Sequence, residues 1–251
     1  MTKIYGRKPA LSGVSVRLSA GRVVGLLGDN GAGKSTLIGI LSTLTRPTSG
    51  RVRFGDAVHA AHGQRGSGGG APLRAQIGLC AHESLLYGDL TALENLELYA
   101  RLYELGQPAQ RAREAATRAG LADEAMVRQV RTFSRGMTQR LALARTLLHD
   151  PRLILLDEPF TGLDQGGQAW LSKLIGELGK SGRLVVVVTH DLAAIANIVD
   201  HVVVLARGKV AIDEARDTPF THAELTAAYV RAAERVPRGA GALPAAAGAG
   251  G

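Results

Sequence analysis

The residues best suited to chemistry form one glycine-rich stretch, residues 28–36, which matches the pattern G-x-x-x-x-G-K-[ST]. In such a loop the glycines let backbone N–H groups turn toward phosphate oxygens, and the N-terminus of a following helix adds a partial positive charge. Lys34 is then placed to reach the β- and γ-phosphates of a nucleotide, and the Ser35 hydroxyl is placed to bind Mg²⁺. The residues expected to contact the nucleotide are Gly28, Asn30, Gly31, Gly33, Lys34, Ser35 and Thr36.

The segments on either side of this loop decide whether it binds phosphate or is an ordinary glycine-rich turn. Residues 23–27 are a short apolar run, which predicts a buried strand. Residues 36–44 repeat leucine and isoleucine at helical spacing, and Arg46 and Pro47 end that run. A strand, a glycine loop and a helix in this order predict a nucleotide-binding site.

Two adjacent carboxylates, Asp157 and Glu158, follow an apolar run at residues 153–156. Phosphoryl transfer to water needs a metal ion, a positioned water and neutralised phosphate charge. At the end of a buried strand, Asp157 can bind Mg²⁺ directly or through water, and Glu158 can polarise the attacking water. The alternative is a helix cap, because Pro159 comes next. The phosphate-binding loop upstream favours the catalytic interpretation.

His190 follows the next apolar run, residues 184–188. A single histidine at a strand end is often structural. In a parallel sheet, however, the carboxyl ends of the strands meet at one edge, so His190 is expected beside the phosphate-binding loop. There a neutral imidazole can bond the γ-phosphate and hold the attacking water.

Composition excludes several classes of protein. The 251 residues suit one α/β domain with a small additional subdomain. The formal charge of +8 comes from scattered arginines and only 4% of the residues are aromatic, which argues against a nucleic-acid partner and favours some attraction to anionic lipid headgroups. Cys80 is the single cysteine, so no internal disulfide can form. No apolar run approaches the ~20 residues that span a bilayer and no signal peptide is recognisable, so the chain is expected to be soluble.

Further strands are expected around the parallel ones. Residues 11–20 alternate apolar and polar side chains, which predicts a half-buried strand. An edge strand is expected at residues 52–54, and another strand at residues 74–80. Residues 202–205 and 210–212 are expected to pair as a hairpin.

Several helices interrupt the alternation of strand and helix. Thr91 and Glu94 form a capping box, which predicts a helix start, and a second helix is predicted around residues 109–119. Ser134 is the expected N-cap of a third helix that continues to position 149. These helices predict an inserted helical subdomain at about residues 84–150.

Three other segments complete the prediction. The glycine-rich residues 62–72 are expected to form a mobile loop. Residues 216–234 are expected to form a C-terminal helical extension. Residues 235–251 are nearly all alanine, glycine and proline, so this tail is expected to be disordered.

The order of these motifs makes residues 1–215 resemble the ATP-binding subunits of ABC transporters. The sequence FSRGM at residues 133–137 is similar to the family signature LSGGQ; it departs at three positions but keeps Ser134 and Gly136, which touch phosphate in the family. Residues 162–164 resemble the D-loop, which brings Asp164 to the nucleotide site, and His190 resembles the H-loop histidine. Tyr5 resembles the aromatic residue that stacks on adenine, although it could instead be a surface tyrosine.

The resemblance implies an α/β fold, that of a P-loop NTPase of the ABC ATPase type. It has a mostly parallel central sheet, an antiparallel β subdomain and an inserted helical subdomain, and it uses ATP and Mg²⁺. In this family ATP lies between the phosphate-binding loop of one subunit and the signature of another, so a second copy or a related ATPase subunit is implied. The helical subdomain would contact a membrane-spanning subunit, at the cytoplasmic face of the inner membrane.

A narrower resemblance rests on His82, which stands where the family has its Q-loop glutamine. By this resemblance His82 would bind Mg²⁺ and help to hold the water. Together with residues 90–96, 99–103, 133–141 and 157–164, it makes the chain similar to the ATP-binding subunits of cytochrome c maturation complexes, which export haem. The sequence CAH at residues 80–82 could suggest a haem site, but a strand cysteine beside a Q-loop residue is the simpler interpretation.

Two other functions share these motifs. An exporter of a drug, lipid or polysaccharide has the same ATPase residues, because the transported substrate does not touch this chain. A soluble ABC ATPase of translation or DNA repair is a second alternative, but such proteins usually carry two cassettes or long insertions.

Overall fold

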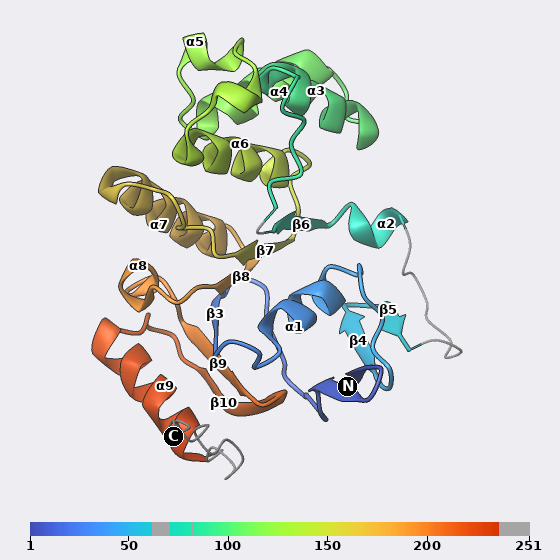
Figure 1. Cartoon of the computed structure of the whole chain (residues 1–251), viewed down its shortest axis with the longest axis vertical. Coiled ribbons are helices and arrows are strands. Elements are labelled where there is room, and N and C mark those ends of the chain that lie inside the picture. The colour runs from blue at the N-terminus through green and yellow to red at the C-terminus, as the bar shows by residue number, and fades with distance from the viewer. Residues whose placement is uncertain (62–70, 82, 236–251) are drawn as a thin grey trace, which may run out of the picture.

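A central sheet organises the fold of the computed structural model, which describes residues 1–61, 71–81 and 83–235 (Figure 1). In the described chain the sheet has six strands in the order β10-β9-β3-β8-β7-β6. Neighbours from β9 to β6 run parallel, and β10 pairs antiparallel with β9 as the predicted hairpin. The strands are β3 (Val23–Leu27), β6 (Ile77–Cys80), β7 (Leu153–Asp157), β8 (Leu184–Val188), β9 (His201–Ala206) and β10 (Lys209–Ala215). The mostly parallel sheet is therefore confirmed.

The inner strands β3, β7 and β8 are buried on both faces, since they are apolar at almost every position rather than at every second one. In β8, Val186 and Val188 pack in the cluster that contains Leu37 of α1. Val185 and Val187 belong to the opposite cluster, with Leu171 of α7. The helices are α1 (Lys34–Leu41), α2 (Ala71–Arg74), α3 (Ala92–Leu102), α4 (Pro108–Arg118), α5 (Asp123–Met126), α6 (Arg135–Leu147), α7 (Gln165–Lys180), α8 (Leu192–Ile195) and α9 (His222–Arg235).

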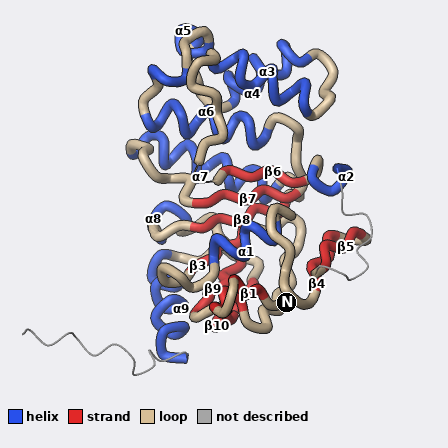
Figure 2. Tube along the Cα trace, turned by 45° about the vertical axis from the view of Figure 1, so that its right-hand side comes forward, coloured by secondary structure: helices blue, strands red, loops and turns tan. Residues whose placement is uncertain are grey.

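Helices α3 to α6 lie together beyond the β6 edge of the sheet (Figure 2). The predicted capping box is confirmed: the Thr91 hydroxyl accepts from the Glu94 N–H, and the Glu94 carboxylate accepts from the Thr91 N–H. The second predicted helix is α4, which begins with Pro108 in its first turn. Ser134 is the N-cap of α6, which ends at Leu147, two residues before the predicted end. Their common core joins Leu96, Ala116 and Leu141.

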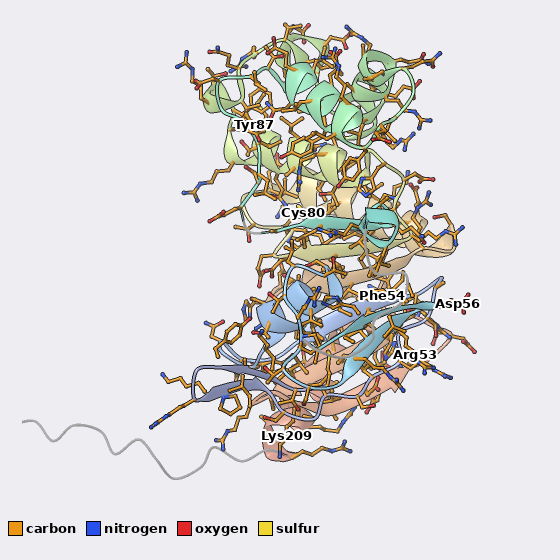
Figure 3. The ribbon with its side chains drawn as sticks, turned by 90° about the vertical axis from the view of Figure 1, so that its right-hand side faces the viewer. Arg53, Phe54, Asp56, Cys80, Tyr87 and Lys209 are labelled. Carbon is orange, nitrogen blue, oxygen red and sulfur yellow. The ribbon has the colours of Figure 1, made fainter. Side chains whose placement is uncertain are left out.

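Two small antiparallel sheets lie near the N-terminus of the chain. One pairs β1 (Lys3–Tyr5) with β2 (Lys8–Leu11), and the other pairs β4 (Arg51–Phe54) with β5 (Ala57–Ala60). The predicted edge strand is therefore β4, and Figure 3 shows Arg53, Phe54 and Asp56 on this hairpin.

The predicted strand over residues 11–20 is wrong. Residues 12–20 form no strand with any segment that the structure describes, although Val14 exchanges backbone hydrogen bonds with Met1. The alternation reflects burial alone: Val14 is buried, and Val16 and Leu18 pack partly buried against the same cluster. The alternation of apolar and polar residues thus indicates which side chains face the core. A strand also needs a neighbouring strand with which its backbone can form hydrogen bonds.

The strand predicted over residues 74–80 is shorter than expected. It begins at Ile77, because residues 71–74 form the helical turn α2. The predicted loop at 62–72 and tail at 235–251 fall mostly outside the described residues. Within residues 1–61, 71–81 and 83–235, no helix is both long and apolar enough to cross a membrane.

Candidate functional site

The carboxyl ends of β3, β8 and β7 meet at one edge of the sheet. Val188 at the end of β8 is the register partner of Leu26 in β3 and of Asp157 in β7, so the three strands end at the same level. The segments that follow them enclose a cleft of ≈ 460 Å³. It is lined by Ala10, Asn30, Gly31, Gly33, Lys34, Ser35, Thr36, Asp157, Glu158, Val188 and His190.

The glycine loop between β3 and α1 cannot be built from other residues without rearrangement. Gly28 has φ 144°, and a Cβ there would lie 2.3 Å from the Leu205 carbonyl oxygen. Gly33 has φ 107°, and its Cβ would lie 2.7 Å from the Ala10 carbonyl oxygen. Both positions combine a left-handed backbone with close packing, which only glycine allows.

Lys34 lies in the loop with its ammonium group bound to the backbone. Nζ donates to the carbonyl oxygens of Gly28 (2.7 Å) and Asp29 (3.1 Å), and the residue is only 8% exposed. Burial lowers the pKa of Lys34, while the carboxylates of Glu158, Asp157 and Asp29 oppose that shift. The side chain is thus a buried cation beside three carboxylates, at the floor of the cleft.

The start of α1 offers hydrogen-bond donors to the cleft. Its first intrahelical bond runs from the Leu37 N–H to the Gly33 carbonyl at 2.9 Å, so the N–H groups of residues 34–36 are not used within the helix. No acidic residue lies in the first turn of α1. Unused N–H groups, Lys34 and the positive end of the helix dipole form a donor set that suits phosphate.

The two carboxylates lie on the opposite wall of the cleft. Asp157 is the last residue of β7, and the Glu158 N–H donates to the Val188 carbonyl at 2.8 Å. Glu158 has φ 50°, a left-handed conformation that is uncommon for this residue type and concentrates at functional sites. Its Oε1 lies 3.5 Å from Nε2 of His190, so the acid and the imidazole meet at the cleft.

The protein supplies few metal ligands of its own. Among the described residues no group of three or more His, Cys, Asp or Glu side chains could hold a metal ion. Ser35 and Asp157 nevertheless both line the cleft. This set fits Mg²⁺, which is typically bound by one or two protein oxygens together with substrate phosphates and water.

The structure does not bring every predicted site residue into this cleft. Its lining in the described chain does not include Gly28, Tyr5, Ser134, Gly136 or Asp164. The Ser134 hydroxyl accepts from the Met137 N–H at 3.3 Å, and Asp164 accepts from the Gly167 N–H at 2.7 Å, so both cap helices.

The signature and D-loop segments instead lie against each other. A Cβ at Gly136 would meet the Gly162 carbonyl oxygen at 3.5 Å. Tyr5 is half exposed in β1, with Lys3 Nζ 4.8 Å from the centre of its ring. His82 lies outside the described residues. Figure 3 shows Cys80 in β6, just before that position.

Two contacts of the site were not predicted. The Tyr229 hydroxyl of α9 donates to the Asp29 carboxylate in the phosphate-binding loop. Gln139 of α6 donates to the Pro159 carbonyl at 3.0 Å and so joins the signature helix to the end of β7. Tyr229 belongs to no motif and lies 200 positions from Asp29, and the motif stretch that contains Gln139 does not indicate its bond to Pro159, so only tertiary structure reveals these contacts.

Comparison with known proteins identifies a family whose model covers the glycine loop and the two carboxylates of the cleft. Residues 11–161 match the family model described as ABC transporter. The chain is 38% identical over 219 residues to the daunorubicin resistance ATP-binding protein DrrA3 of Streptomyces coeruleorubidus, covering 86% of this chain and 66% of that protein. It is 34% identical over 223 residues to the bacitracin transport ATP-binding protein BcrA of Bacillus licheniformis, covering 88% and 69%. It is 32% identical over 210 residues to the linearmycin resistance ATP-binding protein LnrL of Bacillus subtilis (strain 168), covering 83% and 65%.

The solved structures agree with this assignment. The dimeric post-hydrolysis structure of the ATP-binding cassette MJ0796, bound to ADP and Pi, matches with a TM-score of 0.77 and 30% identity, covering 85% of this chain and 95% of that chain. The expected fold class is confirmed. The chain spans just under two thirds of the length of DrrA3 and LnrL.

Proposed function

The chain belongs to the ABC transporter family, and from this premise we propose that it binds and hydrolyses ATP as the nucleotide-binding subunit of an exporter. One observation carries the proposal. The phosphate-binding loop, the carboxylates at the end of β7 and the histidine after β8 line one cleft of ≈ 460 Å³.

Nucleotide binding follows from the donor set of the loop. Lys34 exchanges its bonds to the Gly28 and Asp29 carbonyls for bonds to the β- and γ-phosphates. The free N–H groups at the start of α1 bind the same phosphates. Ser35 and Asp157 are the residues that hold Mg²⁺, which neutralises phosphate charge when it is bound.

Hydrolysis needs a water aimed at the γ-phosphate. Glu158 accepts a proton from this water as the general base, and the left-handed backbone at Glu158 directs its side chain to His190. His190 orients the water and bonds the γ-phosphate. His82 is proposed, from the family resemblance alone, to complete the set beside the metal.

A second subunit completes the site in this proposal. Ser134 and Gly136 lie outside the cleft lining, so within one chain they do not reach the phosphates. The similar cassette MJ0796 is described as a dimer bound to ADP and Pi. We therefore propose a dimer in which the signature of one chain covers the cleft of its partner, with Asp164 at the same interface and Tyr5 stacked on adenine.

The relatives favour a drug-like substrate over haem. DrrA3, BcrA and LnrL are named for daunorubicin, bacitracin and linearmycin, and none of these three is named for haem export. The exporter of small toxic compounds, rather than the cytochrome c maturation complex, is therefore the proposed assembly. Helices α3 to α6 are proposed to contact its membrane-spanning subunit at the cytoplasmic face of the membrane.

Phosphate release by the purified 251-residue chain tests the ATPase. Wild type should release phosphate from ATP only with Mg²⁺, and Lys34→Ala should lose ATP affinity by roughly ten- to a hundredfold, since charge-assisted bonds are lost. Lys173→Ala is the matched control, because that lysine is exposed on α7, where its ammonium lies 3.9 Å from the Glu177 carboxylate. Unchanged ATP affinity in Lys34→Ala would exclude the proposed phosphate-binding role.

The substrate class needs a cellular test. A strain that lacks this protein should become more sensitive to daunorubicin, bacitracin or linearmycin. The wild-type protein should restore resistance in that strain, and Lys34→Ala should not. Unchanged sensitivity together with lost c-type cytochromes would favour haem export instead.

A further inference from the structure

Helix α9 reaches the phosphate-binding loop through one side chain. The Tyr229 hydroxyl donates to Oδ1 of Asp29, across 200 positions of sequence. Asp29 stands inside the loop motif, directly after Gly28. A residue of the C-terminal helix thus contacts the loop from outside the cleft, whose described lining does not include Tyr229.

The position of Tyr229 is set by contacts on both sides of it along α9. Before it, the Glu224 carboxylate accepts from both terminal nitrogens of Arg216 (2.7 and 2.6 Å) and from the Thr221 N–H (2.8 Å). After it, Arg231 donates to both carboxylate oxygens of Glu214 in β10, at 3.0 Å each. The buried face of the helix packs on the sheet through Leu225, Ala228 and Ala232. Figure 1 shows α9 running alongside β9 and β10.

Asp29 can pass the effect of the Tyr229 contact to the rest of the loop, because its backbone carbonyl is bonded within the loop. Its carbonyl oxygen accepts from the Lys34 ammonium and from the Ala32 N–H, each at 3.1 Å. The orientation of this peptide therefore bears on the loop turn and, together with the Gly28 carbonyl at 2.7 Å, on the position of the lysine. A carboxylate left free beside Lys34 would also compete with phosphate for that cation.

We propose that Tyr229 is a positioning residue for the phosphate-binding loop: its hydroxyl keeps the Asp29 carboxylate turned toward α9, which leaves Lys34 available to the phosphates. This inference rests on the proposed nucleotide-binding function. It makes the affinity for nucleotide depend on the docking of α9, an element outside the motifs that define the site.

Calorimetric titration of the 251-residue chain with Mg·ADP tests the inference, because ADP engages the loop without hydrolysis. Tyr229→Phe should weaken ADP binding about three- to tenfold, the value of one partly exposed hydrogen bond to a charged group. Tyr99→Phe is the matched control, since it also removes a tyrosine hydroxyl that donates a hydrogen bond, here to the backbone carbonyl of Leu85. The thermal midpoint of each nucleotide-free variant separates lost affinity from lost folding.

A double-mutant cycle with Asp29→Ala distinguishes positioning from a general structural effect. In the Asp29→Ala background, Tyr229→Phe should have no further effect on ADP affinity. Equal affinity of Tyr229→Phe and wild type, or additive losses in the cycle, would overturn the inference. If Tyr229→Phe were to lower the thermal midpoint of the nucleotide-free chain as well as its affinity for ADP, the contact would be structural and the inference would also be wrong. Lys34→Ala keeps the two proposals apart. If Lys34→Ala retains ADP affinity, the proposed nucleotide-binding function is wrong. If Lys34→Ala loses ADP affinity while Tyr229→Phe does not, only the proposed role of Tyr229 is wrong.

Discussion

His190 Nε2 lies 3.5 Å from Glu158 Oε1, although the two residues follow different strands. The contact exists because β7 and β8 are parallel neighbours, with Asp157 in register with Val188. The Glu158 N–H also donates to the Val188 carbonyl, which fixes the turn that carries the carboxylate. An acid and an imidazole are thereby presented side by side at the wall of the cleft.

Replacing His190 should separate hydrolysis from binding. His190→Ala should lower the rate of phosphate release by roughly 10²–10⁴, the range for loss of a group that positions a transferred proton. ADP affinity should hardly change, because Lys34 and the loop N–H groups remain and ADP has no γ-phosphate for His190 to bond. His222→Ala at the exposed start of α9 is the control. A parallel loss of binding and hydrolysis would mean that His190 supports the loop rather than the reacting water.

The signature should act between subunits. Gly136→Glu should fit within one chain, because a Cβ there meets no closer atom of the described chain than the Gly162 carbonyl oxygen at 3.5 Å. The added carboxylate should repel the partner's nucleotide, so hydrolysis and ATP-dependent dimerisation should be lost while monomer affinity for ADP is retained. Gly106→Glu, in open space between α3 and α4, should change neither property. Full activity of Gly136→Glu would argue against a composite site.

The buried Cys80 thiol should resist modification while the chain is folded. Burial raises the pKa of Cys80 from 9.0 to about 11, so at pH 8 only about 0.1% is the reactive thiolate. Because the neutral thiol is favoured in the fold, this group's contribution to stability is present below pH 9 and is lost as the pH rises toward 11. Iodoacetamide labelling at pH 8 should therefore be far slower in buffer than in urea. Equal rates would show that the β6 edge opens readily.

Much of the fold could be predicted because its signals are local. The strand before Gly28, the capping box at Thr91 and the N-cap at Ser134 each depend on residues within a few positions, and the structure has all three. The convergence of His190 with Glu158 was also predictable, since parallel strands end at one edge. The functional roles of these residues stay predictions until they are measured.

The features that the sequence did not predict depend on which segments lie next to one another in space. Residues 11–20 have the period of a strand, but beyond Leu11, which ends β2, the described chain offers them no neighbouring strand. The contact between Tyr229 and Asp29 joins two elements that share no motif, so no pattern in the sequence indicates it. The sequence carries no signal that identifies the transported substrate. The resemblance to haem exporters rested on motifs that many exporters share.

The most direct test of the proposed mechanism is a single experiment on Glu158→Gln with ATP and Mg²⁺. The variant keeps Asp157, Ser35 and Lys34, so it should bind ATP as wild type does, but it lacks the base that accepts the proton of water. Hydrolysis should fall by roughly 10²–10⁴. The unhydrolysed ATP should hold two chains together, and a dimer containing intact ATP should elute from a sizing column. A Glu158→Gln chain that hydrolyses ATP at the wild-type rate, or that stays monomeric with ATP bound at high protein concentration, would contradict the mechanism.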